Sequence, residues 1–147
     1  MSLTKRHLSR HRKPIDFNPD SLARALEEAC PEALFAFLLG SSKNGHVSVG
    51  SDLDLALFMN DRMSLDLLDR LQAAVDSLHL GVHCDIGSLR NAEPIYRFEA
   101  LKGRLLFTRD SEAYLRFFSL TCREYESQIH NYARQHRYRM ANHDSRA

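Results

Sequence analysis

The stretch that decides the fold runs from residue 39 to residue 57 and reads LGSSKNGHVSVGSDLDLAL. It contains a Gly-Ser pair, Gly40 and Ser41, followed after a polar segment by two aspartates one residue apart, Asp52 and Asp54. Side chains alternate between the two faces of a strand, so both carboxylates are predicted to share one face, while the neighbouring leucines fill the other. The spacing therefore predicts two acidic groups side by side at a strand.

Two neighbouring carboxylates repel each other unless a cation lies between them. Their oxygens suit magnesium, which takes one or two carboxylates and shares its remaining positions with phosphates and water. Upstream, Gly40 follows the apolar run of residues 33–39, and its missing Cβ lets the backbone approach a ligand closely. Ser41 then offers its hydroxyl and nearby amides to an anion at the start of the next helix. The stretch thus predicts a phosphate cradle and metal ligands on two adjacent strands.

The succession Gly-Ser and Asp-x-Asp resembles the signature of the DNA polymerase beta-like nucleotidyltransferase superfamily, and more closely its small members, the minimal nucleotidyltransferases. The resemblance covers about residues 22–108. It implies a third carboxylate on a later strand, which Asp85 offers in a strand predicted over residues 82–89. Asp52, Asp54 and Asp85 are then the expected catalytic residues and the expected ligands of two Mg²⁺ ions. The expected nucleotide contacts are Gly40, Ser41, Ser42, Lys43 and Ser51.

The same resemblance implies a reaction and a partner: transfer of AMP from ATP to a tyrosine hydroxyl of a HEPN-domain ribonuclease toxin, for which the chain would be the antitoxin. Two alternatives stay open. One is nucleotidyl transfer to a small hydroxyl compound such as an aminoglycoside, and the other is neutralisation of the toxin by occlusion alone. Many relatives carry an arginine or aromatic residue where this chain has Ser42 and an arginine where it has Asn44, which leaves room for occlusion. The three aspartates favour catalysis.

Composition indicates one ordinary globular domain. The chain has 147 residues, of which 44% are hydrophobic and 27% charged, and its net charge is +1. The charge is uneven, because residues 17–122 carry ten basic and fifteen acidic side chains while the two ends are basic. An acidic body argues against direct nucleic-acid binding, which depends on clustered Lys and Arg.

Three widely spaced cysteines without a C-x-x-C pattern are typical of reduced intracellular thiols. No apolar run reaches the about 20 residues that span a bilayer, and no apolar segment follows the basic N-terminus as in a signal peptide. We therefore expect a cytoplasmic protein without a membrane segment.

The expected fold class is α+β, with a small mixed β-sheet flanked by helices and a long C-terminal helix. We divide the chain into a basic flexible arm (1–16), a nucleotidyltransferase core (17–109), a C-terminal helix (110–141) and a tail (142–147). Helix starts are predicted at Asn18-Pro19, at Ser64 and at Asp110-Ser111. In the helix after Ser64, apolar residues at 65, 68, 71, 75 and 78 predict the buried face.

The predicted C-terminal helix carries an apolar stripe at positions spaced by four and three residues: Phe118, Cys122, Tyr125, Ile129 and Tyr132. Two interpretations remain open. The stripe packs on its own sheet, or it is a docking surface for a partner or for a second copy of the chain, which would make a homo-oligomer.

Overall fold

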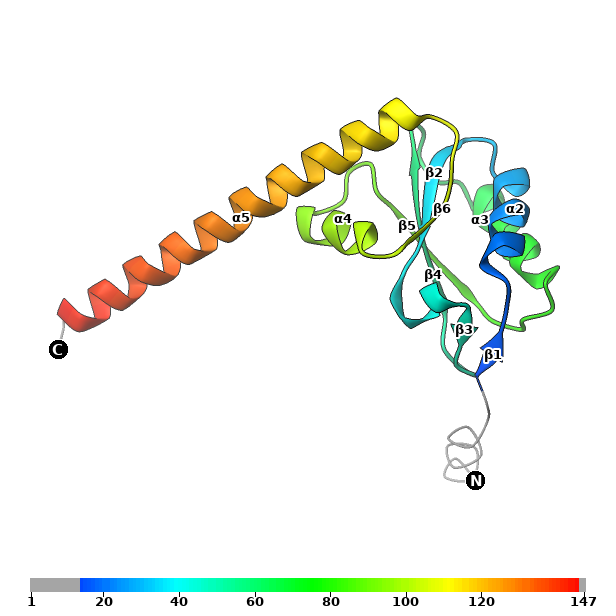
Figure 1. Cartoon of the computed structure of the whole chain (residues 1–147), viewed down its shortest axis with the longest axis horizontal. Helices are drawn as coiled ribbons and strands as arrows, with labels where there is room; N and C mark the ends of the chain where they lie inside the picture. The colour runs from blue at the N-terminus through cyan, green and yellow to red at the C-terminus, as the bar shows by residue number, and fades with distance from the viewer. Residues whose placement is uncertain (1–13, 146–147) are drawn as a thin grey trace, which may run out of the picture.

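A computed structural model describes residues 14–145 (Figure 1). Along the chain the elements are β1 (Ile15–Asp16), α2 (Pro19–Ala29), β2 (Ala33–Leu38), the short 3₁₀ helix η1 (Gly40–Asn44), β3 (His46–Val47), β4 (Leu53–Met59), α3 (Leu65–Asp76), β5 (Cys84–Ser88), α4 (Pro94–Leu101), β6 (Arg104–Thr108) and α5 (Ser111–Ser145).

The central sheet has the strand order β5–β4–β2–β6. Strand β2 is antiparallel to both β4 and β6, whereas β4 and β5 are parallel, so the predicted mixed sheet is confirmed. Beside it, β1 pairs with β3, Ile15 facing Val47. Ile15 and Asp16, assigned above to the flexible arm, are therefore part of a small second sheet. The rest of that arm, residues 1–13, and residues 146–147 of the tail lie outside the described part of the chain.

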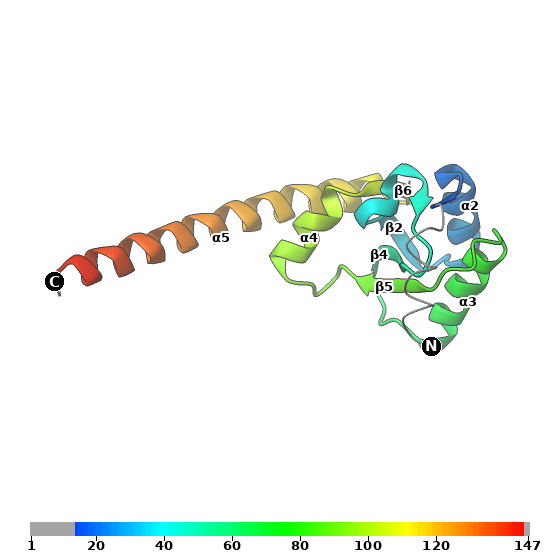
Figure 2. The ribbon, with the colours of Figure 1, turned by 90° about the horizontal axis from the view of Figure 1, so that it is seen from below.

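Strand β2 is apolar on both faces because each face meets a separate core. Ala36 and Leu38 belong to a cluster with residues of α2 and α3, whereas Phe35 and Phe37 belong to a second cluster with residues of α4 and α5. Helices thus cover both faces of the sheet, α2 and α3 on one side and α4 with the start of α5 on the other (Figure 2).

Helix starts follow the predicted caps. The Asn18 side chain accepts a hydrogen bond from the Asp20 amide at 2.9 Å, and the Ser64 hydroxyl accepts one from the Leu67 amide at 3.1 Å. At the start of α5, the carboxylate of Asp110 accepts from the amide of Ala113 at 3.0 Å. Each cap satisfies an amide that the first helical turn leaves unpaired.

The predicted buried face of α3 is correct at Leu71 and Val75 and wrong at its first residue. In α3 the buried residues are Leu67, Leu71 and Val75, whereas Leu65 is 81% exposed. In α5 the buried residues are Ala113, Phe117 and Thr121, and the first two belong to the cluster that lies on the sheet.

The predicted stripe of α5 does not pack on the sheet. Phe118, Ile129 and Tyr132 are all exposed, and Tyr125 stacks on Phe98 of α4 with ring centroids 3.7 Å apart. Beyond that contact α5 leaves the body and runs to Ser145, four residues past its predicted end (Figure 1). No described helix has both the length and the apolar character to cross a membrane.

Arg109, the residue after β6, connects the end of that strand to the segment between α2 and β2. One guanidinium nitrogen donates to the carbonyls of Cys30 and Ala33 at 2.9 and 2.6 Å, and another donates to the carbonyl of Glu27. The guanidinium also lies 4.9 Å from the ring centre of Phe107. Because these carbonyls lie around the end of α2 and the start of β2, Arg109 fixes the strand that leads to the Gly-Ser turn.

Candidate active site

The Gly-Ser pair lies where β2 ends and η1 begins. Gly40 has a backbone φ of +71°, a left-handed conformation that favours glycine, and a Cβ there would lie 3.4 Å from Oδ2 of Asp54. The amide of Leu39 donates to the carbonyl of Asp54 at 2.9 Å. The predicted phosphate cradle is therefore held directly against the strand that carries Asp54.

Within the cradle, the predicted nucleotide contacts differ in accessibility. Ser41 and Lys43 are exposed. Ser42 is 4% exposed, and its hydroxyl donates to the carbonyl of Leu39 at 3.0 Å, so this side chain holds the turn together. Ser51 is exposed and immediately precedes Asp52, with its amide donating to the carbonyl of Ser48 at 3.0 Å.

The aspartates gather at the end of the sheet where β4 and β5 start. Asp54 and Asp85 are direct partners in the parallel pairing of β4 with β5. Asp52 is exposed just before β4, and its Oδ1 lies 3.8 Å from Nδ1 of His83. The amide of Leu53 donates to the carbonyl of His83 at 2.9 Å, which sets the register of the two strands.

Burial raises the pKa of the Asp54 carboxyl above its ordinary value, and the negative charges of Asp85 and Asp52 raise it further. The ionised form of Asp54 is therefore disfavoured unless positive charge arrives. A site with this property attracts a cation, and it also attracts a substrate that brings one with its phosphates.

The donor set fits magnesium in its chemistry. Within residues 14–145 no group of three His, Cys, Asp or Glu side chains is already gathered as a metal-binding set. Magnesium does not require one, since it is usually held by one or two carboxylates together with substrate phosphates and water. Asp54 and Asp85, opposite each other on adjoining strands, supply such a pair.

Tyr96, on α4, lies near Asp54 and Asp85, and this residue was not predicted from the sequence as part of the site. A Cβ at Gly87 would lie 2.1 Å from its hydroxyl oxygen, so the tyrosine rests directly on the glycine backbone. Burial raises the pKa of Tyr96, as do the charges of Asp85 and Asp54. The sequence contains one indication of this contact, which is Gly87. It lies on the same strand face as Asp85, and a residue without a side chain leaves room for a ring above it.

Cys84 lies next to Asp85 but faces the opposite side of the sheet, in the cluster with α2 and α3. Burial raises the pKa of its thiol to about 12, with smaller contributions from Asp76 and Asp52. Its amide donates to the side-chain oxygen of Gln72 at 2.9 Å. Cys84 is therefore a structural thiol that supports the position of Asp85.

Comparison with known proteins agrees with this geometry. Residues 21–112 match the family model described as polymerase beta, nucleotidyltransferase. A search of curated proteins found no match.

Several solved structures share the fold. A mutant of the toxin–antitoxin complex MntA–HpeT contains a chain that is 20% identical, with a TM-score of 0.62, covering 89% of this chain and 100% of that one. A toxin–antitoxin structure with AMP-PNP gives 21% identity and a TM-score of 0.58, with coverage of 89% and 100%. A structure of the tri-AMPylated Shewanella oneidensis HEPN toxin in complex with MNT antitoxin contains a chain that is 18% identical, with a TM-score of 0.56. That match covers 88% of this chain and 96% of the other.

Proposed function

Because the chain belongs to the polymerase beta nucleotidyltransferase family, we propose that it transfers AMP from ATP to a tyrosine hydroxyl of a HEPN-domain toxin and so acts as the antitoxin. The observation that carries this proposal is the placement of Gly40 against Asp54, with Asp85 as the strand partner of Asp54. Nucleotidyl transfer requires a phosphate cradle that lies against a pair of carboxylates.

Solved structures of the same fold support the choice of substrate and partner. One of them contains AMP-PNP, and another contains an AMPylated HEPN toxin in complex with its MNT antitoxin. All three cysteines of this chain are free, which is consistent with a cytoplasmic site of action where ATP is available.

In the proposed reaction, the backbone amides around Gly40 and Ser41 hold the β- and γ-phosphates of ATP. Asp52, Asp54 and Asp85 would hold two Mg²⁺ ions, which when bound neutralise phosphate charge and lower the pKa of the acceptor hydroxyl. Asp85 accepts the hydroxyl proton as the acceptor oxygen attacks the α-phosphorus in line. The new oxygen–phosphorus bond forms, the bond from the α-phosphorus to the β-phosphate oxygen breaks, and pyrophosphate leaves. No covalent enzyme intermediate is needed.

The test is incubation with ATP labelled in its α-phosphate, Mg²⁺ and a HEPN-domain protein, for the wild type and for Asp54→Asn. We expect label on the HEPN-domain protein with the wild type and none with the variant. A stable complex without label would favour occlusion, for which Ser42 and Asn44 in place of the usual residues left room. Label only on an added aminoglycoside would replace the proposed acceptor by a small molecule.

A further inference from the structure

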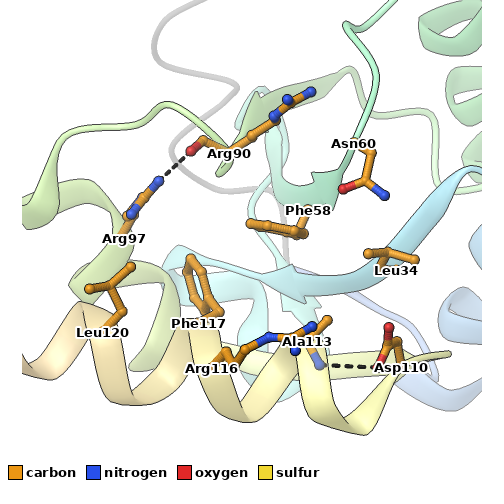
Figure 3. Close-up of a pocket in the computed structure, with 10 residues that line it drawn as sticks. All are labelled: Leu34, Phe58, Asn60, Arg90, Arg97, Asp110, Ala113, Arg116, Phe117 and Leu120. Carbon is orange, nitrogen blue, oxygen red and sulfur yellow. Dashed lines mark hydrogen bonds between the residues drawn. The ribbon is translucent and has the colours of Figure 1, made fainter.

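A second candidate site lies on the same face of the sheet as the aspartates, at the opposite end. Its lining includes Phe58, which follows Asp54 by four residues in β4, so both side chains point to one face. At about 3.3 Å per residue, their Cα atoms are roughly 13 Å apart. We call this pocket, of about 350 Å³, the arginine pocket, because Arg90, Arg97 and Arg116 contribute to its lining (Figure 3).

The base of the arginine pocket is apolar and is formed by packed aromatic rings. The ring of Phe58 is stacked on Phe35 at 4.8 Å between centroids, and it meets Phe117 of α5 at 5.7 Å. In Figure 3 the Phe58 ring lies between the side chains of Arg90 and Arg116. An apolar group entering the pocket would therefore contact aromatic carbon and have guanidinium groups on either side.

The three arginines are not equivalent. Arg97 donates to the carbonyl of Leu89 at 3.0 Å and to that of Arg90, and it lies 3.5 Å from a carboxylate oxygen of Glu124. The side chains of Arg90 and Arg116 are exposed, and neither has a hydrogen bond or ion pair with any other residue of the described chain. As far as residues 14–145 are concerned, these two guanidinium groups are therefore available to bind an external anion.

The arginine pocket continues along α5. A neighbouring groove shares Arg116 and Leu120 with it and adds Leu115, Ser119 and Arg123. Leu115 is 60% exposed and Leu120 46% exposed. Exposed leucines and arginines therefore occur together on this part of α5. The one carboxylate in the pocket lining, that of Asp110, accepts the hydrogen bond from the Ala113 amide.

We infer that this surface docks an acidic segment, with one apolar anchor residue, of the protein that the active site modifies. The inference rests on the proposed function. Carboxylates would pair with Arg90 and Arg116 while an apolar anchor fills the pocket over Phe58. Because the pocket and the aspartates share one sheet face, a single macromolecular acceptor can occupy both. Holding the acceptor there raises its effective concentration at the active site without any change in the chemical step.

The test uses the full chain and a HEPN-domain protein as the acceptor. The variant is the double charge reversal Arg90→Glu/Arg116→Glu, and Leu120→Ser removes an exposed apolar contact separately. The matched control is Arg24→Glu, an exposed arginine on α2 on the other side of the sheet. For each protein we measure the Kd for the acceptor by calorimetry, and kcat and KM for acceptor and for ATP by label transfer.

We expect the double reversal to raise Kd and acceptor KM by roughly tenfold, with a smaller rise for Leu120→Ser and none for Arg24→Glu. The kcat and the KM for ATP should not change. An unchanged Kd in the double reversal overturns the inference, as does a wild type that does not bind the acceptor. A raised KM for ATP would instead make the pocket a nucleotide site and would also overturn it.

The two proposals fail in different ways. If the wild type binds the acceptor and the double reversal weakens that binding, but no label is transferred, the docking surface stands and the proposed reaction is wrong. If label is transferred equally well by the double reversal, the reaction stands and the docking surface is wrong.

Discussion

Replacing Gly40 by alanine would introduce two separate effects that the structure allows us to distinguish. The backbone φ of +71° costs an L-residue about 1–2 kcal/mol. For 147 residues, an unfolding entropy of about 2.1 cal/mol/K per residue converts this cost to a fall in Tm of about 3–6 °C. The new methyl group would also lie 3.4 Å from Oδ2 of Asp54, between the phosphate cradle and the carboxylate.

Gly81 provides a matched control for the backbone effect. Its φ is +64°, and a Cβ there would meet nothing within 4 Å. Gly81→Ala should therefore lower Tm by a similar amount and leave activity unchanged. Gly40→Ala should in addition lower kcat/KM clearly more than Gly81→Ala does, because its methyl group would occupy the space beside Oδ2 of Asp54 where the backbone of the cradle has to approach a phosphate.

The assays are thermal unfolding and label transfer from ATP, the latter measured well below the Tm of both variants. If Gly40→Ala and Gly81→Ala keep equal activity, the cradle does not place phosphates against Asp54. If neither variant lowers Tm, the left-handed conformation assigned to these two glycines is wrong.

Three further predictions follow from charge, burial and hydrogen bonding. Asp54→Asn should raise Tm near neutral pH. Because the pKa of Asp54 is raised in the folded protein, this side chain stabilises the fold only at a pH below its unfolded pKa, and that contribution is lost as the pH rises. A gain in Tm that persists at low pH would contradict this. Iodoacetamide at pH 8 should modify Cys122 first and reach Cys84, whose pKa is raised to about 12, only in denaturant, as peptide mass spectrometry will show. Arg109→Gln should cost about 2 kcal/mol in urea unfolding by removing hydrogen bonds to carbonyls, and an unchanged midpoint would refute the role of Arg109.

The central sheet could be predicted closely because local signals there agree with the tertiary structure. Strand β2 starts at residue 33, where the apolar run starts, and ends one residue before that run does. Gly40 and Asp54 came together as expected, because a Gly-Ser turn and an Asp-x-Asp strand joined by a short segment must be neighbours in an antiparallel pair.

Helix faces were less predictable where several apolar residues stand in succession. Around Phe117 and Phe118 more than one helical stripe satisfies the period, and only the packing on β2 and β4 selects Phe117. Leu65 is apolar but lies in the first turn of α3, where it faces away from the core. Periodicity alone does not resolve such choices.

The features that depend on distant segments could not be predicted from the sequence. Tyr96 reaches the aspartates only because α4 folds over β5, and Arg109 meets carbonyls 76 and 79 residues earlier in the chain. The arginine pocket combines residues from β2, β4, the segment after β5, α4 and α5. No local pattern connects these positions, so only the fold brings them together.

We propose that the site formed by Gly40, Asp54 and Asp85 transfers a nucleoside monophosphate to a protein hydroxyl. The most direct test is to compare ATP labelled in the α-phosphate with ATP labelled in the γ-phosphate, in parallel reactions with a HEPN-domain protein. We expect the α-label to become protein-bound and the γ-label to leave in pyrophosphate. Protein-bound γ-label would show phosphoryl transfer and would refute nucleotidyl transfer at this site.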